Sequence, residues 1–465
     1  MDDPLSPAAR PVTCAVMVFT RDLRIADNPA LAAAAGSARV VPLFVFDDAV
    51  LARCHEHANR LAFLLESLHD LDQSLRGLGG ALVVRRGEWA PTVLRTAIGA
   101  GASQIHVAED VSGYAARRLA RLTADAAAAR IGVTSHPGIT AVRPGAIRPP
   151  GGAAYQIFTP YYRRWLDAPR RPRAAPPARI TLPGGIDTGG IDPGRIPRLG
   201  ELTAAAPSAA ADTAGGESAG RARLLRWVAD HLDSYDAARD DLAADRTSRL
   251  APYFHLGCLS PGAVAADLSG RRGAAAFVRQ IAWRDFFHQV LAARPDAASR
   301  DYRGRGDRWA DDAGALAAWQ AGQTGYPVVD AGMRQLAAEG FLHNRARMIV
   351  ASFLTKDLYI DWRQGAAHFL RYLLDGDIAC NQLNWQWVAG TGTDANPHRI
   401  FNPTLQGRRF DPAGDYVRRY VPELTGLPAG VIHEPPAAAR EALGYPAPLV
   451  DHQAAIAEYR RRPRQ

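Results

Sequence analysis

The chain has 465 residues, a formal net charge of +8 and an isoelectric point of about 9.5. Hydrophobic residues make up 47% of it, which is enough for a buried core and excludes an intrinsically disordered protein. There is no run of about 18 apolar residues, so we expect no membrane span, and the acidic start MDDPLSPAAR does not resemble a signal peptide. The basic charge favours a polyanionic partner, although a GC-rich genome also enriches arginine.

The four cysteines lie far apart, at Cys14, Cys54, Cys258 and Cys380. Their spacings match neither a zinc motif nor a disulfide framework. We therefore expect free thiols, a reducing cytoplasm and no metal site.

The first 140 residues alternate between short apolar runs and longer helical stretches. One helix is expected to start at Pro29, behind the capping residue Asn28. This alternation predicts a parallel, doubly wound, Rossmann-like sheet in an α/β domain over residues 1–140. The turn after the first strand, TRDLRIADNP, lacks the glycine fingerprint of dinucleotide-binding proteins. The predicted strands are 14–20, 40–46, 81–85, 104–108 and 132–136, and the other predicted helices are 59–75, 90–98 and 113–129.

A Pro/Gly/Ala-rich interdomain linker is expected over residues 141–220, most clearly from about residue 168. After Arg221 the strand signals stop, which predicts an all-α domain over 221–465. Most of the tryptophans lie in this half: Trp227, Trp283, Trp309, Trp319, Trp362, Trp385 and Trp387. The predicted helices are 222–240, 261–268, 274–293, 313–321, 330–339, 343–356, 362–374 and 378–387.

The stretch NQLNWQWVAGTGTD combines asparagines with tryptophans on one predicted helix. Asn381 and Trp385 are four residues apart and share a face, whereas Trp387 points elsewhere. An amide beside an indole suits a bound heterocycle, but two core tryptophans with capping asparagines would give the same pattern.

Three other stretches carry polar groups in helical register. In HNRARM, Arg347 needs a carboxylate partner, and Asp375 is a candidate, either in a site or in a structural ion pair. The hydroxyls of TSRLAPYFHLGCLSP suit an anion at a helix start or an ordinary N-cap. The stretch RQIAWRDFFHQV aligns side chains that suit base stacking or simple core packing: Gln280, Trp283, Arg284 and Phe287.

These motifs occur together and in one order: VFTRDLRIADNPAL, TSRLAPYFHLGCLSP, IAWRDFF, WQAGQTGYPVVDAGMRQL, HNRARMIVASFLTKDLYIDWR, DGDIACNQLNWQWVAGTGTDANP and RIFNPTLQGRRFDP. In that order they resemble the photolyase/cryptochrome family, and most closely the class I cyclobutane pyrimidine dimer photolyases of bacteria. The resemblance covers nearly the whole chain.

The resemblance implies an α/β antenna domain followed by a helical domain that holds FAD in a folded form. It places Asn381 near the flavin N5, which would explain the asparagine beside Trp385. By matching motif it implies FAD contacts from Tyr235, Thr247, Ser248, Arg249, Leu250, Arg284, Asn344, Arg347, Asp375, Gly376, Asp377 and Asn381.

The resemblance also implies a light-driven carbon–carbon lyase that repairs cyclobutane pyrimidine dimers. Reduced FAD would give one electron to a dimer flipped out of the duplex, as photolyases in general do, and recover it after the ring splits. Trp385, Trp362 and Trp309 match the family's electron-transfer chain. The expected partner is damaged DNA, with no membrane contact, for a monomer in the cytoplasm near the nucleoid. Residues expected at the lesion or DNA backbone are Arg239, Gln280, Trp283, Asn344, Arg345, Met348 and Trp387.

Two departures keep alternatives open. Dimer photolyases commonly have Glu where this chain has Gln280, and glutamine there resembles (6-4) photolyases and animal-type cryptochromes. The motif HNRARM lacks the second histidine of the (6-4) branch, and the short C-terminal end disfavours a cryptochrome-like photoreceptor. HVAEDVSGYAARR departs from the folate pattern around Glu109, whereas PLFVFD beside TRDLR suits an 8-hydroxy-5-deazaflavin antenna.

Overall fold

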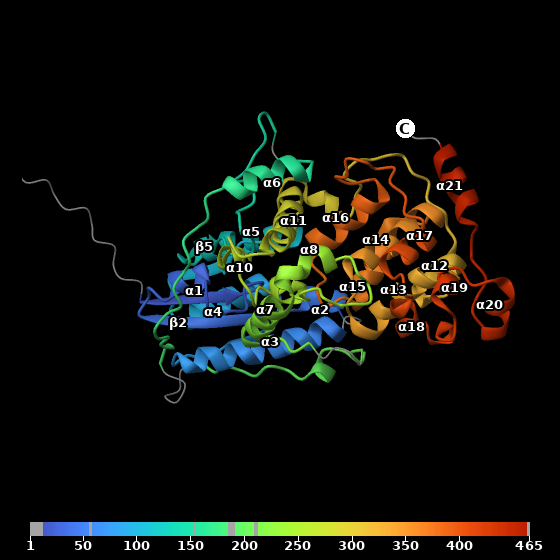
Figure 1. The fold of residues 1–465 in the computed structure, drawn as a ribbon. Coiled ribbons are helices and arrows are strands. Elements are labelled where there is room, and N and C mark those ends of the chain that lie inside the picture. The colour runs from blue at the N-terminus through green and yellow to red at the C-terminus, as the bar shows by residue number, and fades with distance from the viewer. Residues whose placement is uncertain (1–12, 55–57, 153, 185–190, 209–212, 463–465) are drawn as a thin grey trace, which may run out of the picture.

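The computed structural model describes residues 13–54, 58–152, 154–184, 191–208 and 213–462 (Figure 1). Five parallel strands form one sheet in the order β3-β2-β1-β4-β5. This confirms the predicted parallel sheet, and every predicted strand is present within three residues of its expected ends. The strands are β1 Cys14–Phe19, β2 Arg39–Asp47, β3 Val83–Gly87, β4 Gln104–Ala108 and β5 Gly132–His136.

Alternate residues of the buried strands pack on opposite faces of the sheet. Val16 and Val18 of β1 pack in a core with α4 (Trp89–Gly99) and α5 (Gly113–Ala128). Their neighbours along the strand join a second core with α1 (Pro29–Ala34) and α3 (Ala58–Gly77), which continues into the helical domain. A short helix, α2 (Asp48–Cys54), follows β2. The sheet is therefore covered on both faces, as the apolar strands predict.

Residues 141–220 are not simply an extended linker. Their first part contains α6 (Phe158–Asp167), which buries Phe158, Tyr161 and Trp165 and packs against α11 (Ala274–Ala293). The prediction missed this helix because proline and arginine surround its three apolar anchors. Beyond it, the backbone follows the α/β domain, where Ile180 N donates to Leu78 O at 2.8 Å.

The second half is helical, as predicted, and none of the described strands lies in it. The single helix expected over 222–240 is divided into α7 (Glu217–His231), a 3-10 turn and α8 (Tyr235–Ala238). A π-helical turn (Phe353–Asp357) follows α14. The remaining helices are α9 Ala251–His255, α10 Pro261–Leu268, α12 Ala313–Ala321, α13 Pro327–Glu339, α14 Asn344–Ser352, α15 Trp362–Tyr372, α16 Ile378–Ala389, α17 Pro403–Phe410, α18 Asp415–Tyr420, α19 Ala429–Ile432, α20 Ala437–Leu443 and α21 His452–Arg461.

In the described part of the chain, no helix is long and apolar enough to cross a membrane. Cys14, Cys258 and Cys380 are free thiols there, and the side chain of Cys54 lies outside the described residues.

Candidate functional site

A cavity of about 470 Å³ lies in the helical domain between α8, α9, α11, α14 and α16. Figure 1 shows α8, α11, α14 and α16 near the middle of the molecule, between the sheet and the helices of the C-terminal part. Most of the residues singled out from the sequence line it: Tyr235, Arg239, Thr247, Ser248, Gln280, Trp283, Arg284, Asn344, Arg345, Arg347, Met348, Asp375, Asp377, Asn381, Trp385 and Trp387.

Helix α16 supplies the asparagines and tryptophans of the opening motif. Its N-cap, Asp377, accepts a hydrogen bond from Cys380 N at 2.9 Å. Asn381 and Trp385 both face the cavity, as their spacing predicted, and Asn381 Nδ2 donates to Ala366 O at 3.1 Å. Trp387 lines the cavity too, but it is partly exposed whereas Trp385 is buried, as expected for positions on different faces of the helix.

Arg347 and Asp375 form the predicted ion pair. Arg347 Nη2 lies 3.0 Å from both carboxylate oxygens, and Nε donates to Leu342 O at 2.8 Å. Because both side chains also line the cavity, the pair fixes the wall and places charge beside any ligand.

Helix α11 also lines the cavity, with the four side chains expected on one face. Trp283 stacks on Phe158 of α6, with ring centroids 3.7 Å apart and an interplanar angle of 7°. Arg284 donates to Phe254 O at 3.2 Å. Among the described residues, the Gln280 amide has only a long contact of 3.5 Å, to Ala276 O within its own helix. Its hydrogen-bonding capacity is therefore largely available to a ligand.

The hydroxyls of the TSRL motif lie at one end of the cavity. Thr247 Oγ1 is buried and has no hydrogen-bond partner within the described part of the chain, so a bound polar group would satisfy it. Arg249 instead forms ion pairs with Asp245 at 2.6 Å and Glu339 at 2.9 Å. Leu250 is packed in the core, and a side chain at Gly376 would collide with Arg60. These three predicted FAD contacts are thus outside the cavity lining, and their contact with FAD stays a prediction.

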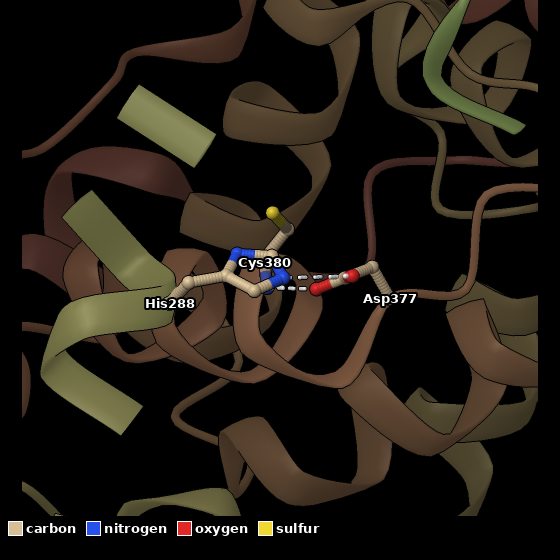
Figure 2. A group of neighbouring side chains, drawn as sticks. All are labelled: His288, Asp377 and Cys380. Atoms are coloured by element: carbon tan, nitrogen blue, oxygen red, sulfur yellow. Dashed lines mark hydrogen bonds and ion pairs between the residues drawn. The ribbon is translucent and has the colours of Figure 1, made fainter. Parts of the chain in front are cut away.

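The cavity floor contains a charged cluster around Asp377 that the sequence did not reveal. Figure 2 shows His288, whose Nε2 lies 3.3 Å from Asp377 Oδ2, beside Cys380. Ligand atoms of these three residues lie within 4.8 Å of one another, a composition that metal sites also use. Asp377, however, is already ion-paired with Arg21, and burial, followed by the charge of Asp377, holds the pKa of the Cys380 thiol well above its usual range. We therefore assign the group to charge pairing in the cavity wall.

The three tryptophans expected to carry electrons differ in where they lie and in how far they are buried. Trp385 lines the cavity, and its ring packs so closely on α15 that a side chain at Gly365 would collide with it. Trp362 is fully buried at the start of α15, and its Nε1 donates to Asp301 at 2.8 Å. Trp309 is partly exposed and packs against Tyr359, with centroids 4.9 Å apart. Trp385 and Trp362 are thus buried and Trp309 reaches the surface, and their role in electron transfer stays a prediction.

Comparison with known proteins places this geometry in a family. Residues 15–179 match the family described as DNA photolyase, and residues 277–465 match the FAD binding domain of DNA photolyase. The chain belongs to the DNA photolyase family. It is 49% identical to the deoxyribodipyrimidine photo-lyase of Streptomyces griseus over 97% of this chain and 99% of that one.

Solved structures agree with this assignment. A class III photolyase from Agrobacterium tumefaciens matches with a TM-score of 0.87 and 33% identity over 97% of both chains. A cryptochrome from Synechocystis matches with a TM-score of 0.89 and 28% identity, over 97% of this chain and 99% of that one. Both the two-domain fold and the order of its parts are therefore those of the family.

Proposed function

We propose that the chain is an FAD-dependent photolyase that repairs cyclobutane pyrimidine dimers in DNA. The observation that carries the proposal is a single cavity whose lining combines two kinds of side chain. Asn381 and the Arg347–Asp375 ion pair suit a flavin, and the indole of Trp283 and the amide of Gln280 suit a pyrimidine.

The cavity lining fits FAD in its chemistry. Thr247 and Ser248 offer hydroxyls for phosphate oxygens, and the unpaired Thr247 Oγ1 is a donor without another use. Asn381 and the Arg347–Asp375 pair would hold the ring system, and Arg284 would place positive charge beside it. FAD, when bound in its reduced form, supplies the photoexcited electron that the reaction needs. The buried walls exclude water from that electron's path.

The lesion side would be held by aromatic and basic residues. Trp283 is fixed by its stack on Phe158, and Trp387 carries Arg399 over its ring at 4.9 Å. Two indoles held in this way would replace the stacking that a dimer loses when it leaves the duplex. Arg239 and Arg345 would add backbone affinity, and Asn344 and Met348 would complete the lesion contact. Because arginine–phosphate contacts release counterions, binding should weaken as salt rises.

Trp385, Trp362 and Trp309 would connect the cavity to the surface for reduction of the flavin. Each position is an indole, and indole loses an electron more readily than most side chains. Burial of Trp362 keeps the intermediate position dry, and the partial exposure of Trp309 gives an external reductant access.

For the antenna we propose an 8-hydroxy-5-deazaflavin near the carboxyl end of β2. Arg118 lies 4.4 Å from the Trp89 ring and 3.7 Å from Asp47, the last residue of β2. A cation and an aromatic ring beside the strand end suit a planar, anionic chromophore. We further propose that the protein acts as a monomer on DNA in the nucleoid.

The test is repair of an oligothymidine that carries cyclobutane dimers. The purified protein, with its flavin reduced, should restore thymine absorbance under blue light and not in darkness. Light-dependent recovery would also show that Gln280 suffices in place of glutamate. Failure by protein with intact, reduced FAD would contradict the proposal, and a (6-4) lesion would then be the next substrate.

A further inference from the structure

The loop between β1 and α1, which contains the TRDLR motif, lies at a conspicuous place in the sheet. Strand order reverses between β1 and β4, and open α/β sheets usually bind ligands in the crevice at that point. Here the protein's own charges occupy it. Arg21 follows β1, Asp110 follows β4, and Arg21 Nη1 lies 3.5 Å from Asp110 Oδ2.

Arg21 extends from this crevice into the helical domain. It pairs with Asp377 in the floor of the cavity, and its Nε donates to His255 O at 3.1 Å. The loop is held in place on both sides of the arginine. Leu23 N donates to Leu256 O at 3.1 Å, and Gly257, with φ of +70°, leaves no room for a side chain against the Arg21 backbone.

Through Asp377, the contact with Arg21 affects the charge in the cavity. Its carboxylate lines the cavity and caps the helix that carries Asn381, Trp385 and Trp387. Burial alone would raise the pKa of Asp377, but Arg21, followed by His288, more than offsets burial and holds that pKa well below its usual range. The groups that face Asp377 from the surrounding elements are Arg21 with its partner Asp110, His255, His288, Cys380 and, next to Gly376, Arg60.

We propose that Arg21 is a positioning residue for the flavin, supplied by the α/β domain and independent of any antenna chromophore. It keeps the Asp377 carboxylate ionised and directed at the start of α16, and it neutralises that charge where the flavin must accept electrons. The inference rests on the proposed FAD site. It also assigns a role to the TRDLR loop, which lacks the glycine fingerprint of dinucleotide-binding proteins.

The consequence of removing Arg21 has a definite sign. In Arg21→Gln, the Asp377 charge is uncompensated, which disfavours adding electrons to a neighbouring flavin, so the midpoint potential of the flavin should fall. Affinity for FAD should weaken about tenfold, the equivalent of one pKa unit of interaction. Because Asp377 can then take up a proton more easily, both effects should be smaller at pH 6 than at pH 8.

The experiment compares full-length variants by FAD dissociation constant and midpoint potential at these two pH values. Arg21→Gln should show both losses, Arg21→Lys should recover most of them, and Arg21→Gln combined with Asp377→Asn should recover the potential. The matched control is Arg171→Gln, which removes a bidentate pair to Asp27 on the same loop, at 2.6 and 2.7 Å, without touching the cavity.

The control should lower the melting temperature and leave the potential unchanged. Equal potentials in Arg21→Gln and wild type, or a loss of potential that Asp377→Asn does not recover, would overturn the inference. If Arg21→Gln does not fold, folded Asp377→Asn supplies the test: it leaves the Arg21 charge uncompensated, so the midpoint potential should rise, and an unchanged potential would overturn the inference. Dimer repair by wild-type protein is measured separately, so failure of the proposed function would be distinguishable.

Discussion

The polar groups at the strand ends of the α/β domain differ from those in the helical cavity in whether they have hydrogen-bond or ion-pair partners within the described part of the chain. At the strand ends of the α/β domain, Arg21 and Asp110 satisfy each other and join the two domains. In the helical cavity, Thr247 Oγ1 and Trp385 Nε1 are buried without partners in the described part of the chain, and Gln280 has only a long contact. Unsatisfied polar groups in an enclosed space indicate where a ligand completes the structure. The crevice between β1 and β4, where open α/β sheets usually bind ligands, is therefore filled by an interdomain contact here. The unsatisfied groups indicate that the flavin site lies in the helical cavity instead.

We expect the largest effect from a substitution of Trp309, the tryptophan proposed to connect the cavity with the surface. Trp309→Phe should slow photoreduction of oxidised FAD about a hundredfold, which corresponds to about 2.7 kcal/mol of added barrier. Repair by chemically reduced protein should be unchanged. Trp319→Phe is the control. The Trp319 ring lies 6.0 Å from the Trp385 ring, centroid to centroid, but it is fully buried and therefore gives no path to the surface. Photoreduction of Trp309→Phe at the wild-type rate would remove this residue from the electron path.

The ion pair in the cavity wall should give the next effect. Arg347→Met leaves Asp375 without its cation in a largely buried place, and we expect a loss of about 2 kcal/mol in the free energy of unfolding. Urea titration of the FAD-free protein measures this without a contribution from the ligand. Arg408→Met, which breaks an exposed pair with Glu434 at 2.7 Å, should cost less than about 1 kcal/mol. Equal losses of unfolding free energy in the two variants would mean that the Arg347–Asp375 pair contributes no more to stability than an exposed ion pair.

The lesion side of the cavity should give a smaller effect on DNA. Trp387→Ala should weaken binding of dimer-containing DNA about tenfold, as expected for one lost stacking platform. Binding of undamaged DNA should not change, because phosphate contacts carry no information about the lesion. Equal weakening for both DNAs, measured by fluorescence anisotropy, would show that the residue contacts the backbone rather than the dimer.

The smallest expected effect is on how the stability of the protein depends on pH, through the N-cap of α14, the helix that carries Asn344 and Arg347. His343 Nδ1 caps α14 by accepting from Arg345 N at 3.1 Å, and burial lowers the pKa of His343 to about 4. The unfolded chain takes up the proton first, so stability is complete above about pH 6.5 and is lost as the pH falls toward 4. His343→Asn keeps an acceptor without titrating, and it should remove about 1 kcal/mol of this loss at pH 5. Identical acid unfolding curves would contradict this role.

Local pattern predicted those parts of the structure that depend on neighbours in sequence. The strands were recognisable because β1 is apolar throughout and β2 is apolar between Arg39 and Asp47, and the Arg347–Asp375 pair because an arginine in an apolar helix needs a counterion. Phe158 and α6 were missed because their burial depends on Trp283, far along the chain. The pairing of Arg21 with Asp377 spans 356 residues, and no local pattern reports such a contact.

The central claim is that flavin and lesion occupy one cavity, and binding measured on the flavin itself tests it most directly. Reduced protein should be titrated with an oligothymidine that carries one dimer, and with the same strand undamaged, while flavin fluorescence is recorded with excitation too weak to repair a measurable share of the dimers. We predict that only the damaged strand quenches the flavin, because only a dimer in the cavity is close enough to accept its electron. Equal fluorescence with both strands, at concentrations where anisotropy shows both bound, would contradict a shared cavity.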